Sequence, residues 1–363
     1  MSLLYDARLI ENSGIGTTIR GQLRELIARK FDVRVIGNPD TIRKVLPEYS
    51  GEIVPFTAPL YSIKEQFRFP SPGSHRLHIP HYNIPLRFAS RLSVTVHDLI
   101  HLQSDEFKSP IYRTYARVLL GTIARRAPCI FTVSETTRGH FLEMFPEARP
   151  RTFTTLNGIE HNIFRPAKDS SVQAFRKRYG VPGDFLLAVG IAKRHKNLDL
   201  LLRVLTGLWR TDFPFPLVLA GTSGKIPDYA RTLFQENAVR KNVILLPHIP
   251  ESDLPTLYSA ASALVIPSKL EGFGLPALEA MACGTPVLAS TAGSLKEVCA
   301  DSALYFDPES EADLSASLQK FAESKPLRKK LATRGLNRAQ NFTWKRNVDG
   351  MLRGFDLTGK APT

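Results

Sequence analysis

The chain has 363 residues, of which 43% are hydrophobic and 23% charged, and its formal net charge is +14. This length favours two domains over one, and this composition is that of an ordinary globular protein, which excludes a largely disordered chain. The three cysteines, Cys129, Cys283 and Cys299, lack the spacing of metal ligands. We therefore expect reduced thiols and a cytoplasmic protein.

Neither a membrane span nor a secretory signal is apparent. No apolar run reaches the roughly 18 residues that a transmembrane helix requires, and the N-terminus has no basic segment followed by a long apolar one. The positive charge is spread over both halves of the chain. Spread charge suits polyanionic small ligands or an anionic membrane surface as well as RNA. Because no recognised RNA-binding motif is present, we expect no nucleic-acid partner.

Short β-type runs alternate with helical patterns along the first half. We expect helices at residues 17–30, 110–126 and 135–144, and strands at residues 2–6, 32–36, 51–56, 76–79, 93–96, 129–133 and 152–156. A second series of strands, again with helices between them, is expected at residues 185–190, 217–220, 243–246, 263–266, 286–289 and 303–306. Several of these runs are continuously apolar, which is typical of parallel strands covered by helices on both faces. The pattern predicts an α/β protein with two doubly wound parallel sheets.

A polar stretch after residue 163 separates the two series. It predicts one domain over residues 1–165 and a second over residues 166–340. Residues 341–355 form an amphipathic pattern after the last strand, so residues 341–363 are expected to be a C-terminal helix and tail.

The strongest local signal is residues 267–290, PSKLEGFGLPALEAMACGTPVLAS. A buried strand ends there, and a Gly-rich loop containing Glu271 leads into a helix that carries Glu279. Glycines let a backbone approach a ligand closely, and the amides at a helix N-terminus suit a phosphate. Two carboxylates beside such a loop accept hydrogen bonds from the hydroxyls of a sugar and a ribose. In the alternative, Glu271 is merely solvated and Glu279 stabilises the helix start.

This segment resembles the Glu-x7-Glu signature of retaining glycosyltransferase family 4, with both Glu, the GFG-x-P loop and A-x-G-x-P-V in order. The resemblance implies the GT-B fold, in which two Rossmann-like domains face each other across a cleft. It assigns Glu271 to the donor sugar and Glu279 to the ribose. It also places the amides of Phe273, Gly274 and Leu275 against sugar and phosphate oxygens.

Two segments of the first domain resemble the same family. The SGIG turn, with Gly14 and Gly16, is similar to the Gly-rich loop that approaches the donor phosphates, although an ordinary turn has the same sequence. VTVHDLIHL places His97 at the carboxyl end of a strand, near the transferred sugar, while Asp98 is expected to brace the loop. In the alternative, His97 has only a structural role. Ser134 is expected to cap the helix that follows it.

The segment AVGIAKRHKNLDLLL departs from the family pattern. Lys196 matches the lysine of the basic pair that clamps the diphosphate. His195 stands in the usual arginine position, and Arg194 precedes it. A guanidinium forms bidentate hydrogen bonds to two phosphate oxygens, which an imidazole cannot do. We therefore expect Arg194 to substitute for that arginine. The alternative, a solvated helix start, is less attractive because cations there oppose the helix dipole.

The resemblance implies hexosyl transfer with retention, from GDP-mannose as the first choice or a UDP-sugar as the second, to a glycan or lipid-linked acceptor. Bacterial mannosyltransferases of surface-polysaccharide assembly are the most similar kind. We expect no metal, since no Asp-x-Asp motif is present and cations can stabilise the leaving diphosphate. A GT-B phosphorylase and a non-catalytic nucleotide-sugar or nucleic-acid binding protein remain alternatives, whereas the Glu-x7-Glu pattern argues against an epimerase.

The predicted helix at residues 110–126 interleaves arginines with aromatic and aliphatic residues. In one interpretation this helix lies in a lipid interface, so that the protein contacts the inner face of the membrane peripherally. In the favoured alternative, Tyr112, Tyr115, Leu119 and Ile123 pack against the sheet and the arginines face water.

Overall fold

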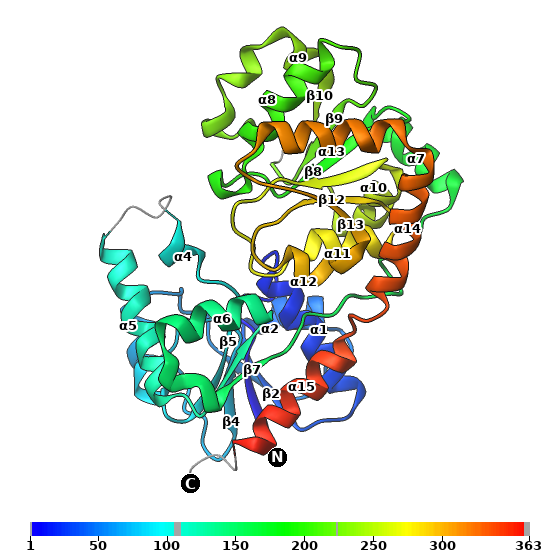
Figure 1. Cartoon of the computed structure of the whole chain (residues 1–363). Coiled ribbons are helices and arrows are strands. Elements are labelled where there is room, and N and C mark those ends of the chain that lie inside the picture. The colour runs from blue at the N-terminus through cyan, green and yellow to red at the C-terminus, as the bar shows by residue number, and fades with distance from the viewer. Residues whose placement is uncertain (1, 105–109, 223, 359–363) are drawn as a thin grey trace. The chain divides into compact units, whose positions relative to one another are not determined.

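The structure is a computed structural model that describes residues 2–104, 110–222 and 224–358, apart from the side chain of Tyr112. The chain divides into two compact units (Figure 1). Unit 1 comprises Met1–Gly158 together with Phe342–Thr363, and unit 2 comprises Ile159–Asn341.

Unit 1 is built on a parallel sheet, which has seven strands among the described residues, in the order β3-β2-β1-β4-β5-β6-β7. The chain starts in the middle, moves to one edge, then returns and moves to the other, which is the doubly wound arrangement. The strands are β1 (Leu3–Asp6), β2 (Val33–Gly37), β3 (Ile53–Pro55), β4 (Arg76–Ile79), β5 (Leu92–Val96), β6 (Cys129–Thr132) and β7 (Thr152–Thr154).

Helices cover both faces of this sheet. Leu3 and Tyr5 of β1 pack with α1, α2 and α15, whereas Leu4 packs in a second cluster with α5 and α6. Successive residues of a strand point to opposite faces, so β1 contributes to both cores. The helices of unit 1 are α1 (Ile15–Ala28), α2 (Pro39–Val45), α3 (Ile63–Arg68), α4 (Ile100–Gln103), α5 (Pro110–Arg126), α6 (Glu135–Met144) and α15 (Trp344–Leu357).

Unit 2 repeats the same plan. Its parallel sheet has six strands among the described residues, in the order β10-β9-β8-β11-β12-β13. The strands are β8 (Leu186–Val189), β9 (Leu217–Ala220), β10 (Val243–Leu245), β11 (Ala263–Ile266), β12 (Val287–Ser290) and β13 (Ala303–Phe306). Every strand predicted from the sequence in either unit is thereby confirmed, and no strand end is shifted by more than two residues.

One face of the second sheet is covered by α8 and α13, whose leucines and Phe321 form the main core of unit 2 with strands β8, β9 and β11. The helices of unit 2 are α7 (Asp169–Tyr179), α8 (Leu198–Trp209), α9 (Asn237–Asn242), α10 (Leu254–Ala260), α11 (Leu275–Ala282), α12 (Leu295–Cys299), α13 (Glu311–Glu323) and α14 (Lys325–Ala339).

The last helix belongs to unit 1, where α15 lies beside α1 (Figure 1). A β-carbon added at Gly21 would lie 2.0 Å from the ring of Trp344, and one at Gly158 would lie 2.3 Å from its backbone nitrogen. Because Gly158 packs against α15, unit 1 ends there and not at the predicted residue 165. The C-terminal helix begins at Trp344, three residues after the predicted start, because Thr343 caps it by accepting from the Arg346 amide. Residues 359–363 of the predicted tail lie outside the described residues.

Candidate functional site

Glu271 and Lys196 meet at the carboxyl edge of the sheet in unit 2. The Nζ atom of Lys196 donates to Oε2 of Glu271 at 2.8 Å, and the two side chains are 22% and 12% exposed. Ser268 Oγ donates to the same carboxylate oxygen at 3.2 Å. Lys196, Ser268 and Glu271 line one small cavity together with apolar residues of β8, β11 and the start of α11. In doubly wound sheets, ligands bind at this edge.

The backbone of the Glu271 loop is held by the segment after β12. Ser294 donates its backbone amide to the Glu271 carbonyl at 3.3 Å, and Ser290 Oγ donates to the Ser268 carbonyl at 2.6 Å. Gly293 has φ +55, and a β-carbon there would lie 2.3 Å from the Glu271 carbonyl oxygen. A side chain at this position is therefore excluded by contact and by backbone conformation.

The loop leads directly into helix α11. Gly274 is the N-cap residue, with φ 93, and Pro276 occupies the first turn, a favoured position for proline. Phe273 is buried at 5% exposure and anchors the loop. The first amides of a helix have no intrahelical acceptor, so those of Leu275 and its neighbours lie where an anion is favoured.

Lys196 is presented by a single-turn helix, η3 (Arg194–Lys196), between β8 and α8. Asn197, the next residue, is buried and has the left-handed φ of 59. Its side-chain amide donates to the carbonyls of Pro267 and Pro308 at 3.0 and 2.9 Å. These bonds fix the η3 turn to the strand that precedes Glu271. No motif in the sequence indicated this role of Asn197.

Arg194 and His195 take different positions from Lys196. The guanidinium of Arg194 lies over the ring of Tyr229, 5.7 Å from its centroid, and Tyr229 donates its hydroxyl to the Ile191 carbonyl at 2.7 Å. The carbonyl of His195 accepts from the amide of Lys269 at 2.8 Å. In this turn, Lys196 forms the ion pair with Glu271.

Glu279 lies one turn into α11 and is held by a residue that the sequence did not single out. Tyr258 of α10 is fully buried, and its hydroxyl donates to Oε2 of Glu279 at 2.6 Å. Burial and the neighbouring Glu279 carboxylate raise the pKa of Tyr258 well above its usual value. Tyr258 therefore stays protonated and acts as a donor that orients the carboxylate.

In unit 1, Gly14 and Gly16 lie at the start of α1. Gly14 is the N-cap residue with φ 69 and has open space around its α-carbon. A β-carbon at Gly16 would lie 2.7 Å from the Ile10 carbonyl oxygen, so the chain packs closely there. Gly14 is compatible with close approach of a ligand, and Gly16 has a structural reason to be glycine.

His97 follows β5, and its Nε2 atom lies 2.8 Å from the Pro80 carbonyl. Burial lowers the pKa of His97, so the ring is neutral at pH 7 and Nε2 carries the proton. That tautomer makes Nδ1 a hydrogen-bond acceptor, which suits a sugar hydroxyl. Asp98 accepts from the Ile100 amide at 3.1 Å, which confirms its predicted role in bracing the loop. Ser134 accepts from the Thr137 amide, which confirms the predicted cap.

A buried charge cluster, also missed from the sequence, lies beyond the carboxyl end of β1. Arg8 donates to Asp6 and to Glu65, each at 2.7 Å, and His81 Nε2 lies 3.4 Å from Asp6. Burial alone would raise the pKa of Asp6, but the neighbouring His81 ring and the charge and hydrogen bonds of Arg8 outweigh it and lower that pKa. Removing one member would leave a buried charge unpaired, so this cluster fixes the segments around it.

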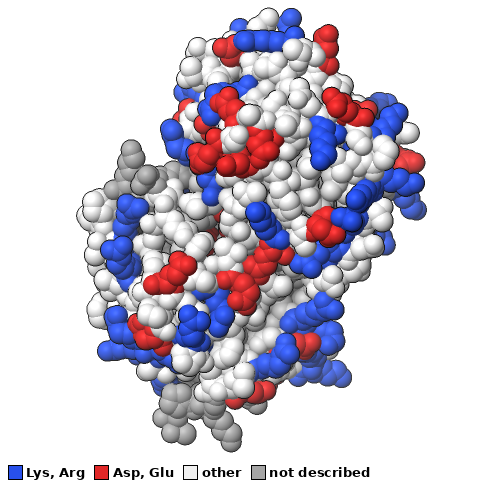
Figure 2. All heavy atoms as spheres, in the orientation of Figure 1, with Lys and Arg blue, Asp and Glu red and all other residues white. Residues whose placement is uncertain are grey.

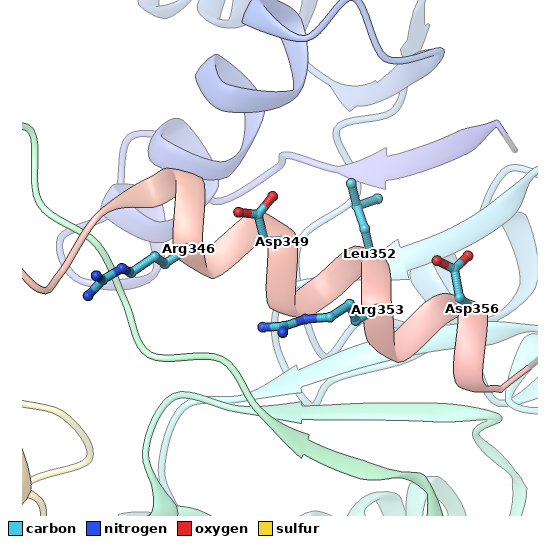
Figure 3. Close-up of a pocket in the computed structure, with 5 residues that line it drawn as sticks. All are labelled: Arg346, Asp349, Leu352, Arg353 and Asp356. Carbon is cyan, nitrogen blue, oxygen red and sulfur yellow. The ribbon is translucent and has the colours of Figure 1, made fainter.

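A different cavity, whose lining includes none of the predicted site residues, lies along α15 (Figure 3). The side chains that Figure 3 labels all come from this one helix. Asp349 is paired with Arg29 at 2.6 Å and with Lys345 at 3.0 Å. The pair with Lys345 is an i,i+4 pair within α15, and the pair with Arg29 joins α15 to the end of α1. Such pairs are typical of a solvated helix face, so we assign no catalytic role to this cavity.

The next observations concern the distribution of charge and of possible metal ligands. On the face seen in Figure 2, Lys and Arg alternate with Asp and Glu and do not gather in one patch. Within residues 2–104, 110–222 and 224–358, no group of three or more His, Cys, Asp or Glu is arranged to hold a metal ion. In the same part of the chain, the structure contains no helix with the length and apolarity of a membrane span.

Two doubly wound parallel sheets, with Lys196 and Glu271 at the carboxyl edge of the second, define the GT-B fold. A solved structure confirms this. The chain superposes on the Anabaena protein Alr3699/HepE in complex with UDP-glucose with a TM-score of 0.78 at 17% identity, over 98% of this chain and 100% of that one. Residues 172–338 match the family model of the glycosyl transferases group 1 and lie within unit 2. The chain therefore carries a glycosyl transferases group 1 domain in unit 2.

Curated relatives agree with this assignment. The chain is 29% identical to the O-antigen chain mannosyltransferase B of Escherichia coli over 77% of this chain and 74% of that protein. It is 33% identical to the D-inositol 3-phosphate glycosyltransferase of Frankia alni over 60% of this chain. The matched region spans 56% of the length of the Frankia alni protein.

Proposed function

We propose that this glycosyltransferase moves a hexose, mannose in the first instance, from a nucleotide-diphosphate sugar to a glycan or lipid-linked acceptor of surface-polysaccharide assembly. The transfer retains the anomeric configuration, as in family 4, and requires no divalent metal. The supporting observation is the Lys196–Glu271 pair beside the N-terminus of α11. It combines a cation for a diphosphate, a carboxylate for sugar hydroxyls and helix amides for phosphate oxygens.

In this reaction the bond between the sugar C1 and the diphosphate oxygen breaks, and its electron pair leaves with the diphosphate. Lys196, Arg194 and the α11 amides stabilise the charge that develops on that oxygen. The acceptor oxygen bonds to C1 on the same face, and its proton passes to the leaving phosphate oxygen. Glu271 holds the hydroxyls of the transferred sugar, and Glu279, oriented by Tyr258, holds the ribose.

The mannosyl donor and the polysaccharide acceptor are supported by the name of the Escherichia coli relative. GDP-mannose is the first donor to test, and UDP-glucose or a UDP-hexosamine is the second choice. A lipid-linked acceptor places the enzyme in the cytoplasm with peripheral contact to the inner face of the membrane. The positive net charge of +14 suits an anionic lipid surface.

A thermal-shift panel of nucleotide sugars tests the donor. A donor present at about 100 times its Kd adds about 2.7 kcal/mol to the stability of unit 2. We expect the largest shift with GDP-mannose and a smaller one with GDP alone. Nuclear magnetic resonance of the product then reports the anomeric configuration. Stabilisation by no nucleotide sugar would contradict the proposal, and product formed only when inorganic phosphate is supplied would indicate a phosphorylase instead.

A further inference from the structure

Four of the nine exposed large hydrophobic side chains of the described residues lie within residues 61–86. Tyr61 is 50% exposed, Ile63 79%, Phe67 73% and Leu86 38%. We call these four side chains the α3 patch. Single exposed apolar residues are normal on a soluble protein, but a group on one short segment calls for a partner.

Two of the four side chains of the α3 patch lie on one side of helix α3. Ile63 and Phe67 are four residues apart and therefore share a face of α3. Glu65 projects roughly opposite to them, is fully buried, and accepts hydrogen bonds from Arg8, Asn83 and the Tyr61 amide. The buried charge cluster of unit 1 thus anchors the inner face of α3 and leaves the apolar face outward.

The outward face is also held rigidly by its neighbours. Gln66 donates its side-chain amide to the Ile84 carbonyl at 3.0 Å and accepts from the Leu86 amide at 3.1 Å. Arg87 donates to the Phe67 carbonyl at 2.8 Å. The ring of Tyr61 packs edge-on against Tyr115 of α5 at 5.8 Å. The patch is therefore preorganised, and little ordering entropy is lost when it is covered.

Positive charge borders the patch. Lys64, Arg68 and Arg87 are exposed, and Lys64 and Arg68 share the next face of α3 around the helix axis. Between Glu52 and Asp98 the sequence contains no acidic residue except the buried Glu65. Apolar and aromatic side chains beside exposed cations, without acidic ones among them, are the pattern of a surface that enters the headgroup region of an anionic bilayer.

We propose that the α3 patch inserts into the interface of an anionic lipid bilayer while Lys64, Arg68 and Arg87 contact its headgroups. A stable protein interface commonly takes about 20–30 residues a side, many more than this patch offers, whereas shallow insertion needs only a few. In helix α5, Leu119, Leu120 and Ile123 are buried in the core of unit 1, so these three side chains are not available to lipid, whereas Ile111 and Val118 of that helix are exposed. The inference rests on the proposed function in that a lipid-linked acceptor requires the enzyme to reach a membrane.

Co-sedimentation of the full chain with two kinds of vesicle tests this role. One kind is phosphatidylcholine alone, and the other is phosphatidylcholine and phosphatidylglycerol in equal parts. The wild-type protein should sediment with the mixed vesicles and be released as salt is raised. Ile63→Ser/Phe67→Ser should lower its partition constant by at least about tenfold. Lys64→Ser/Arg68→Ser should lower it by about tenfold or more on the mixed vesicles alone.

Two matched control variants remove exposed apolar or basic side chains that lie outside the α3 patch. Leu357→Ser replaces another exposed apolar residue, and Lys329→Ser/Lys330→Ser replaces two exposed lysines of α14. Both should sediment as the wild type does. Calorimetry with GDP-mannose separates this inference from the proposed function, because every variant should bind the donor equally. A patch variant that sediments like the wild type would overturn the inference. A concentration-dependent dimer lost in Ile63→Ser/Phe67→Ser would also overturn it and assign the patch to a second copy.

Discussion

Lys196 donates to Glu271 across 2.8 Å, although 75 residues separate the two in sequence. The pair joins the turn after β8 to the loop after β11, which are neighbouring strands of the sheet in unit 2. Before a donor binds, each side chain is the counter-ion of the other. In the proposed mechanism, a diphosphate that draws Lys196 away would also free an oxygen of Glu271 for the hydroxyls of the sugar, so that donor binding and sugar recognition would be coupled.

Replacement of Lys196 by alanine should weaken the binding of a nucleoside diphosphate. One charge-assisted hydrogen bond is lost, which corresponds to about 1.5–3 kcal/mol, and an unpaired Glu271 carboxylate then repels the diphosphate. Titration calorimetry measures the change. Lys269→Ala, which removes an exposed lysine paired with Glu309, is the control. Arg194→Ala should have a smaller effect, because its guanidinium lies over Tyr229. If Lys196→Ala bound the nucleoside diphosphate with unchanged affinity, Lys196 could not be a ligand of the diphosphate.

Glu271→Ala should leave the fold intact and reduce transfer by at least about 100-fold, as the loss of one transition-state contact commonly does. Binding of the nucleoside diphosphate should not fall, because the lost contact is to the sugar. The double variant Lys196→Ala/Glu271→Ala should recover part of the diphosphate affinity lost in Lys196→Ala, since the repulsive carboxylate is gone. Glu309→Ala is the control for turnover. Near wild-type turnover in Glu271→Ala would remove this residue from the site.

The alternation of strands and helices was predictable because several of the buried parallel strands are continuous apolar runs, and the thirteen strands of the described residues each match an expected strand. Glu271 and Lys196 were also recognisable, because the segments that contain them resemble those of glycosyltransferase family 4. Tyr258 and Asn197 were not, because each contributes through a contact distant in sequence and has an ordinary local context. The α3 patch was missed for a similar reason. Only the burial of Glu65 shows which side of that helix faces outward.

Gly293→Ala should lower both the stability of unit 2 and the rate of transfer. The new β-carbon would lie 2.3 Å from the Glu271 carbonyl, and φ +55 is a conformation that costs alanine about 1–2 kcal/mol. The loop must move, and Glu271 moves with it. Thermal unfolding and steady-state kinetics measure the two effects. Gly183→Ala is a matched control in the same unit, because no atom lies within 4 Å of its added β-carbon. Unchanged kinetics in Gly293→Ala would show that the loop position does not matter.

Transfer should persist after treatment with EDTA. The cations and helix amides near Glu271 stabilise the leaving diphosphate without a divalent ion in our mechanism, so chelation removes nothing that the reaction needs. Initial rates with and without EDTA, at saturating donor, are the measurement. Rates restored by magnesium or manganese after a complete loss in EDTA would contradict the proposal and require a metal that is bound through the donor diphosphate.

The stability of unit 1 should fall as the pH is lowered below about 6.5. His78 is fully buried between Ser93, at 2.9 Å, and Thr95, at 3.3 Å. Burial, with smaller contributions from His97 and His81, lowers the pKa of His78 to about 3. The unfolded chain therefore takes up a proton that the folded chain does not, and the free energy of unfolding drops by up to about 1.4 kcal/mol per pH unit until the pH approaches the folded pKa.

His78→Gln should reduce the pH dependence of the stability of unit 1. A part of that dependence should remain, because the pKa of His97 is lowered as well. A reporter for unit 1 is available, since the chain has two tryptophans, Trp344 in unit 1 and Trp209 in unit 2. In a Trp209→Phe background, the fluorescence of Trp344 follows the unfolding of unit 1 by urea at each pH. The slope of stability against pH should be smaller in His78→Gln than with histidine present. Equal slopes would mean that His78 becomes protonated in the folded protein, so that burial does not hold it neutral.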